Sequence, residues 1–246
     1  MRANGVCFSI AAHAAWAPGL TNAEQWAAWA RAPHTIVPGA DPALRQMPAM
    51  LRRRAGLPGK FALEVAYACL DGKFDVPTVF CSRHGEVGRA IELLTDLAEG
   101  TPLSPTGFGL AVHNASAGLF SIARADRANH IALAAGASTV ESAVIEACSL
   151  LAEGAPQVLL VAYDQALPPL LSQFQDCQEQ PYGFAWLIEP AGQAPLSLSW
   201  SMADEAAPTA PEAMPPGLDV LRFHLSGAAS LERQAGRRRW RWSRHV

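Results

Sequence analysis

Apolar residues gather in short runs that turn-forming residues separate. The run at 157–164, QVLLVAYD, is almost continuously apolar, as is typical of a strand buried on both faces of a sheet. Further strands are predicted at 5–16, 76–82, 130–135 and in the two segments FAWLIEP and PLSLSWSM, the last two in antiparallel orientation. The chain therefore carries enough strand material for one sizeable sheet.

Between these runs, apolar residues recur at helical spacing. The clearest predicted helices lie at 21–32, 86–100 and 138–154. Thr21 or Asn22 can cap the first helix, and Gly100 ends the second. Ser138 and Glu141 match the capping-box pattern at the start of the third helix.

Strands alternating with helices predict an α/β fold, with a mostly parallel sheet and helices on both faces. We expect one domain over residues 1–246. An α/β core at 1–203 is followed by an Ala-, Pro- and Glu-rich loop at 204–216 and an Arg/Trp-rich segment at 217–246.

Composition narrows the class of protein. The chain is 50% hydrophobic and 17% charged with a net charge of −3, so a globular fold is expected and nucleic acid is not an expected partner. The five cysteines show no metal-ligand spacing, which favours free thiols in a reducing compartment. We expect no signal peptide and no membrane span, and a cytoplasmic location without cofactor or metal.

The stretch IALAAGASTVESA at 131–143 predicts a strand, a sharp turn and a helix, a geometry that often presents a nucleophile. The turn holds Gly136 and Ala137, neither of which can attack a substrate. Ser138 is the nearest hydroxyl, and it is either a helix cap or a nucleophile with His113 as its base. His84 in SRHGE lies at a second strand-to-helix corner, where a structural role is the simpler interpretation.

Arginines form two clusters. Arg52, Arg53 and Arg54 follow one another near a predicted helix end, and Arg237, Arg238 and Arg239 precede two tryptophans. The second cluster suits an edge strand that packs its tryptophans inward, or a contact with an acidic partner or an anionic membrane surface.

Several motifs together resemble a known family. The string SPTGFGLAVHNASAGLFSIARADRANHIALAAGASTVESAVIEA, with MLRRRAGLPGKFALEVA, SRHGEVGRAIELLTDLAEG and YGFAWLIEP, is similar to β-ketoacyl synthase N-terminal domains. Within that family it resembles the chain-length-factor-like proteins of aryl polyene and related pathways. The resemblance implies a thiolase-like fold, of which this chain would form the N-terminal half only.

The resemblance also implies that catalytic groups are missing. Active ketosynthases carry a cysteine at the elbow and two histidines from the second half of the fold, and Gly136 and Ala137 stand at the elbow here. Decarboxylative condensation needs both the thiolate and the histidine donors. We therefore expect a non-catalytic partner of an active β-ketoacyl synthase, in a heterodimer that elongates polyene or fatty-acid-like chains on acyl carrier protein.

By the same resemblance, residues 106–137 form an interface with the synthase or a wall of its acyl tunnel. The candidate residues are Phe108, Leu110, His113, Asn114, Leu119 and Phe120. The two arginine clusters are candidate contacts for the carrier protein. Two alternatives remain open: an acyl hydrolase or acyltransferase that uses Ser138, and a scaffold that docks to a carrier protein or a membrane.

Overall fold

The computed structural model describes residues 4–204 and 212–245. Its strands are β1 (Asn4–Trp16), β2 (Thr78–Cys81), β3 (His130–Leu133), β4 (Val158–Asp164), β5 (Tyr182–Pro190), β6 (Leu196–Met202), β7 (Ser230–Ala235) and β8 (Arg238–Arg244). Its helices are α1 (Ala23–Arg31), α2 (Ala49–Arg52), α3 (Leu57–Leu70), α4 (Val87–Ala98), α5 (Pro105–Gly109), α6 (Ala115–Arg124), α7 (Thr139–Ala152) and α8 (Pro216–Ser226). Short 3-10 turns lie at Gly136–Ser138 and Pro169–Phe174. The predicted strands and the three predicted helices are present.

All strands join one sheet in the order β3-β2-β4-β5-β1-β6-β8-β7. Only the pairs of β2 with β3 and β4 are parallel, and the other five pairs are antiparallel. The expectation of a mostly parallel sheet was therefore wrong. Helical crossovers connect only β2, β3 and β4, whereas β1 enters the middle of the sheet between β5 and β6.

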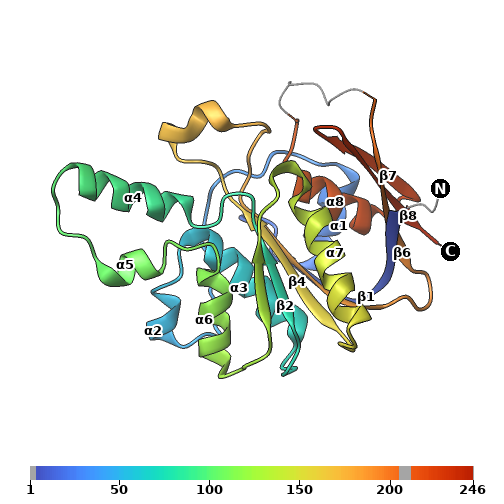
Figure 1. Cartoon of the computed structure of the whole chain (residues 1–246), viewed down its shortest axis with the longest axis horizontal. Coiled ribbons are helices and arrows are strands. Elements are labelled where there is room, and N and C mark those ends of the chain that lie inside the picture. Colours follow the sequence, from blue (N-terminus) through green and yellow to red (C-terminus); the bar gives the residue numbers. More distant parts are fainter. Residues whose placement is uncertain (1–3, 205–211, 246) are drawn as a thin grey trace.

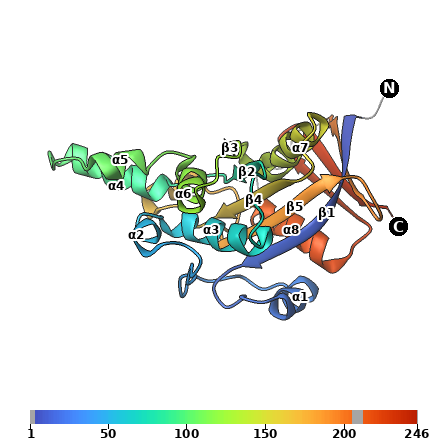
Figure 2. The same ribbon diagram turned by 90° about the horizontal axis from the view of Figure 1, so that it is seen from below.

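Helices cover both faces of the central sheet, as expected (Figures 1 and 2). On one face, α7 packs against β4 and β5, and α1 and α8 complete a cluster that includes Trp186 and Trp242. On the other face, α3 and α6 pack around Phe61 and Phe120. β4 is buried along its whole length, in agreement with its continuous apolar run.

One close approach fixes α3 on the sheet. A Cβ atom on Gly183 of β5 would lie 2.9 Å from the backbone carbon and oxygen of Phe61. Glycine is therefore required at this position, because any larger residue would push α3 away from β5.

The C-terminal segment completes the sheet as a hairpin. Trp240 and Trp242 of β8 are fully buried, which confirms the predicted inward packing of the tryptophans. The strand is not at the edge, however, because β7 pairs on its outer side. The predicted 204–216 loop lies partly outside the described residues, and its last residue, Pro216, already begins α8.

Two helices project from the body. α4 and α5 pair with each other and form an arm at one end of the long axis (Figure 1). Neither helix contains a buried residue. The apolar face of α4 therefore remains uncovered, with Leu94 and Leu97 exposed by 59% and 61%. Among the described helices, none is long and apolar enough to cross a bilayer.

Candidate functional site

The predicted elbow between β3 and α7 is present. Gly136 has a φ of 55°, in the left-handed region that glycine tolerates best. A Cβ atom at this position would meet nothing within 4 Å, so the tip of the turn is open. The cavity beneath it, lined among others by Arg83, Thr139 and Asp164, measures about 10 Å³. A space of this size holds no more than one water molecule.

Thr139 holds the elbow in shape. Its Oγ1 accepts a hydrogen bond from the backbone N–H of Ala135 at 3.0 Å and donates one to the carbonyl of Gly136 at 2.7 Å. Ser138 makes no capping bond, because its Oγ instead accepts the indole N–H of Trp240 at 2.9 Å. The predicted capping box is therefore wrong, because Ser138 bonds to Trp240 of the C-terminal hairpin rather than to the helix backbone.

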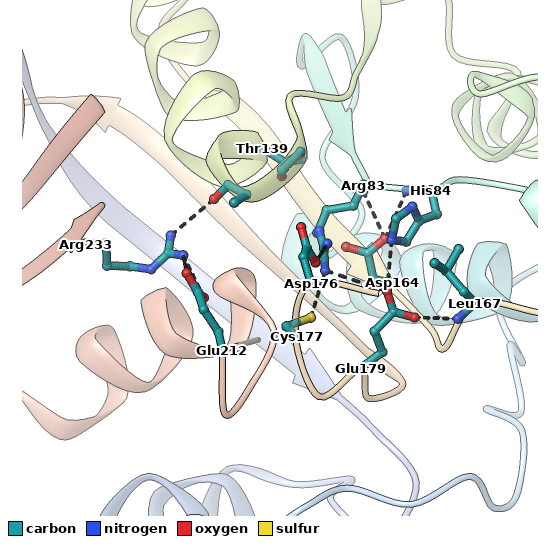
Figure 3. A network of polar contacts seen from close by, with 12 residues as sticks. Arg83, His84, Thr139, Asp164, Leu167, Asp176, Cys177, Glu179, Glu212 and Arg233 are labelled. Carbon is teal, nitrogen blue, oxygen red and sulfur yellow. Dashed lines mark hydrogen bonds and ion pairs between the residues drawn. The ribbon is translucent and has the colours of Figure 1, made fainter. Parts of the chain in front are cut away.

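In a capping box, the carboxylate of Glu141 would accept the backbone N–H of Ser138. Here the carboxylate pairs with Arg233 instead. Arg233 Nη1 of β7 lies 2.7 Å from Glu141 Oε1, and the side chains are 4% and 0% exposed. The indole of Trp242 donates to the same carboxylate at 3.4 Å, and Glu212 pairs with the other side of the guanidinium at 3.2 Å. Burial raises the pKa of Glu141, while Arg233 opposes this shift. These contacts therefore attach the β7–β8 hairpin to the start of α7 (Figure 3).

A second buried network surrounds the carboxyl end of β4. Asp164 Oδ1 accepts hydrogen bonds from Ser82 Oγ at 2.7 Å and from the backbone N–H of Arg83 at 2.9 Å. Tyr182 donates to the other oxygen at 3.4 Å. Burial raises the pKa of Asp164, and the bond from Ser82 opposes the shift. The SRHGE loop after β2 is therefore held at the end of β4 by its hydrogen bonds to Asp164.

Arg83 and His84 extend this network to the segment before β5. Arg83 donates to Asp176 and, at 2.9 Å, to the sulfur of Cys177, while His84 Nε2 lies 3.0 Å from Glu179 Oε1 (Figure 3). Asp176, Cys177 and Glu179 offer ligand atoms within 4.8 Å of one another, the spacing of a metal site. The Arg83 guanidinium already provides the positive charge among them. Burial raises the pKa of Cys177 to about 11, and Arg83 opposes this rise. The arrangement ties two loops together and keeps the thiol protonated.

The hydrolase hypothesis requires Ser138 and His113 to meet, and each is bonded to another group. His113 Nε2 lies 3.1 Å from the carbonyl oxygen of Leu133, whereas Ser138 accepts from Trp240. His113 also packs over Gly85, where a Cβ atom would lie 2.5 Å from Nδ1. These contacts give His113 a structural role between the SRHGE loop and β3.

The predicted interface residues divide into two groups. Phe108 is 68% exposed on α5, Leu110 is half-buried and Asn114 is exposed. Leu119 and Phe120 are only 5% and 4% exposed and pack in the core of α3 and α6. The interface assignment is therefore corrected for Leu119 and Phe120. They lie on the inner face of α6, which a sequence alone does not orient.

The two arginine clusters lie far apart. Arg53 and Arg54 are exposed beside α2, and Arg52 donates to the carbonyls of Ala43 and Leu44. Arg237, Arg238 and Arg239 are exposed in the β7–β8 hairpin, at the other end of the molecule (Figure 1). The structure therefore separates the two candidate contacts into independent surfaces.

Sequence reasoning missed the residues that hold the elbow from a distance. Arg233 and Glu141 are 92 positions apart, and Arg83 and Cys177 are 94 apart. No local spacing marks such pairs. The one available signal was the SRHGE motif, whose polar residues follow a buried strand and must find partners there.

Comparison with known proteins agrees with this geometry. A family model described as "Beta-ketoacyl synthase, N-terminal domain" matches residues 26–243. A chain of the structure "Ketosynthase (ApeO) in Complex with its Chain Length Factor (ApeC)" from Xenorhabdus doucetiae shares 27% identity, with 97% of this chain and 99% of that chain covered and a TM-score of 0.83. A search of curated proteins found no match.

Two more distant structures share the fold alone. "The ishigamide ketosynthase/chain length factor" is 16% identical over 81% of this chain and 68% of that chain, with a TM-score of 0.63. A β-ketoacyl synthase from Burkholderia phymatum STM815 is 12% identical over 92% and 71%, with a TM-score of 0.61. The mixed sheet with helices on both faces is accordingly thiolase-like and corresponds to the N-terminal half of that fold. The chain therefore belongs to the family of β-ketoacyl synthase N-terminal domains.

Proposed function

We propose that this chain is a non-catalytic, chain-length-factor-like partner of an active β-ketoacyl synthase. The observation that carries the proposal is the uncovered apolar arm of α4 and α5. Leu94, Leu97 and Phe108 are each more than half exposed there, and apolar side chains that cluster on a surface mark interaction sites. An apolar stripe of this kind favours burial against another subunit.

The edge strand β3 contacts α6 and offers a second surface for a partner. Within the described residues, β3 pairs on one side only, with β2, and its residues are all half-buried. An open edge strand suits a continuous sheet across two subunits. Residues 106–137, which include α5, α6 and β3, then form the contact with the synthase.

The elbow supports the non-catalytic part of the proposal. Gly136 stands at its tip, and Ser138 is occupied by Trp240. The chain would therefore shape the neighbouring acyl tunnel rather than hold the acyl group. Phe108 and Leu110 are the candidates for its wall, and the growing polyene or fatty-acid-like chain would stay on an acyl carrier protein. Such a complex would work in the cytoplasm.

The solved relatives offer a further argument. One similar structure is named as a ketosynthase with its chain length factor, and another as a type II carrier protein in complex with its ketosynthase. By analogy, Arg52, Arg53 and Arg54 are proposed as a contact for an acidic carrier protein, because Arg53 and Arg54 are exposed cations and Arg52 lies half-buried beside them.

The first test is co-expression with the β-ketoacyl synthase encoded nearest to this chain, followed by mass determination of the purified complex. We expect a one-to-one complex that condenses acyl and malonyl carrier protein. Its activity should be unchanged by Ser138→Ala. A chain that remains alone in the presence of the synthase would overturn the proposal, as would acyl transfer by the isolated chain that Ser138→Ala abolishes.

A further inference from the structure

Among the residues that the structure describes, no helix covers one face of the C-terminal half of the sheet. Strict alternation in β6 and β8 turns Leu198, Trp240 and Trp242 toward α8 and its neighbours. The core that α3 and α6 build on the opposite side contains no residue of β6, β7 or β8. The alternate side chains there are Ser197, Ser199, Ser201, Ser230, Glu232, Gln234, Arg239, Arg241 and Ser243. They form a flat polar surface, which we call the hairpin face.

Positive charge without an ion-pair partner is concentrated at one end of the hairpin. The turn at Gly236, with a φ of 56°, leads into Arg237, Arg238 and Arg239, all exposed. Arg239 lies on the hairpin face, whereas Arg238 alternates to the side of Trp240. Within the described part of the chain, none of these three arginines forms an ion pair. Arg237 donates to a backbone carbonyl, and Arg238 lies 5.4 Å from the ring centre of Trp240. Neither contact neutralises the charge.

The rest of the hairpin face adds one more cation and many hydroxyl groups. Arg241 projects from the same side as Arg239, and its Nη1 lies 3.7 Å from the exposed carboxylate of Glu232. Ser199 and Ser201 lie opposite these two arginines on β6. Guanidinium groups beside hydroxyl groups match a surface of carboxylates, because both donate hydrogen bonds to oxygen.

Burial of the tryptophans decides between two kinds of anionic partner. A membrane contact through an Arg/Trp segment needs the indoles at the surface, whereas Trp240 and Trp242 are fully buried. The exposed apolar side chain nearest to the tip is Met202, on the end of β6. We therefore propose that the hairpin face is a docking surface for an acidic protein segment.

This docking is independent of the proposed pairing with a synthase. β3 and β7 are the two opposite edges of the sheet, and the α4–α5 arm and the hairpin lie at opposite ends of the long axis (Figure 1). Both surfaces are therefore available at the same time. The inference can fail while the pairing holds, and the reverse is equally possible.

Binding of fluorescently labelled poly-L-glutamate to the full chain, alone and in complex with its synthase, tests the inference. The variant Arg237→Glu/Arg239→Glu should weaken binding by about tenfold or more, because each reversal replaces an attraction by a repulsion. The matched control Arg31→Glu/Arg45→Glu changes the net charge equally at two exposed arginines outside both clusters. It should leave most of the affinity, and wild-type binding should fall steeply with salt.

A second probe separates the alternative partner. Vesicles of anionic phospholipid are sedimented with the wild-type chain and with both variants. Equal loss of poly-L-glutamate binding in the two variants, or no binding at all, overturns the proposal, as does vesicle binding that depends on Arg237 and Arg239. Unfolding midpoints within experimental error of the wild type verify that the exposed substitutions leave the fold intact.

Discussion

The indole N–H of Trp240 donates to the hydroxyl of Ser138 across 102 positions of sequence, at 2.9 Å. This bond joins the β7–β8 hairpin, the last two strands of the sheet, to the elbow before α7. The hydroxyl nearest to the nucleophile position thus acts as a hydrogen-bond acceptor for a buried ring. Strands β7 and β8 therefore hold the elbow in place.

Ser138→Ala should lower the free energy of unfolding by about 1–2 kcal/mol, because a buried indole N–H loses its acceptor. Trp240→Phe should cost more, since it also removes buried volume. In a double-mutant cycle measured by urea unfolding, the two changes should be coupled, with the double variant less destabilised than the sum. Simple additivity would contradict a direct bond between the two side chains.

Arg233→Leu should destabilise the chain by about 3–5 kcal/mol near neutral pH, because it leaves the fully buried Glu141 without its counter-charge. The control Arg241→Gln removes only an exposed ion pair and should have little effect. Urea unfolding of both variants beside the wild type measures the difference.

The cost of Arg233→Leu should depend on pH. Burial already raises the pKa of Glu141 in the folded chain above its value in the unfolded chain, and loss of Arg233 raises it further. Such a carboxyl disfavours folding when ionised, so stability falls as pH rises from the unfolded toward the folded pKa. The penalty of the variant should therefore shrink as pH is lowered from about 8 to about 5. A pH-independent penalty would point to lost packing alone.

Asp164→Ala and Asp164→Asn should differ. Alanine leaves Ser82 and the Arg83 N–H without an acceptor in a buried place, at a cost of about 2–4 kcal/mol. Asparagine keeps one carbonyl oxygen for both donors and should cost much less. Asp41→Ala is the control, because it removes only an ion pair with Lys60 whose two side chains are both partly exposed. Thermal unfolding of the three variants gives the ranking, and equal losses for alanine and asparagine would mean that charge matters more than the two bonds.

Leu94→Asp/Leu97→Asp should weaken pairing with the synthase by at least about tenfold while the unfolding midpoint stays unchanged, because both side chains are exposed in the single chain. Met202→Asp provides a control, since Met202 is 68% exposed at the other end of the molecule. Affinity is measured by titration of one purified subunit with the other. Unimpaired pairing would remove the arm from the interface.

Local pattern predicted the elements but not the directions of the strands. The apolar run of β4 and the Arg/Trp alternation of β8 were sufficient to recognise buried and half-buried strands. The place of β1 between β5 and β6 depends on contacts more than 170 positions apart, such as Phe8 with Pro190. No short-range signal carries such information, and the predicted parallel sheet was wrong for this reason.

The candidate site shows the same division. The turn at Gly136 could be predicted, because it depends on neighbouring residues. The function of Ser138 could not, because its hydroxyl is shared with a strand from the end of the chain. Leu119 and Phe120 were assigned to an interface because they lie in the segment that the family resemblance places against a partner. Only the packing of α6 against α3 shows that both side chains face inward.

The two edges of the sheet differ in one respect that bears on assembly. β3 offers an open edge, while β7 buries the charged side chain of Arg233 and leaves the carboxylate of Glu232 exposed. Charges turned inward and outward on an edge strand discourage the addition of another strand. A sheet that can grow at one edge only gives a closed pair of subunits, whereas two open edges would allow chains to add without end.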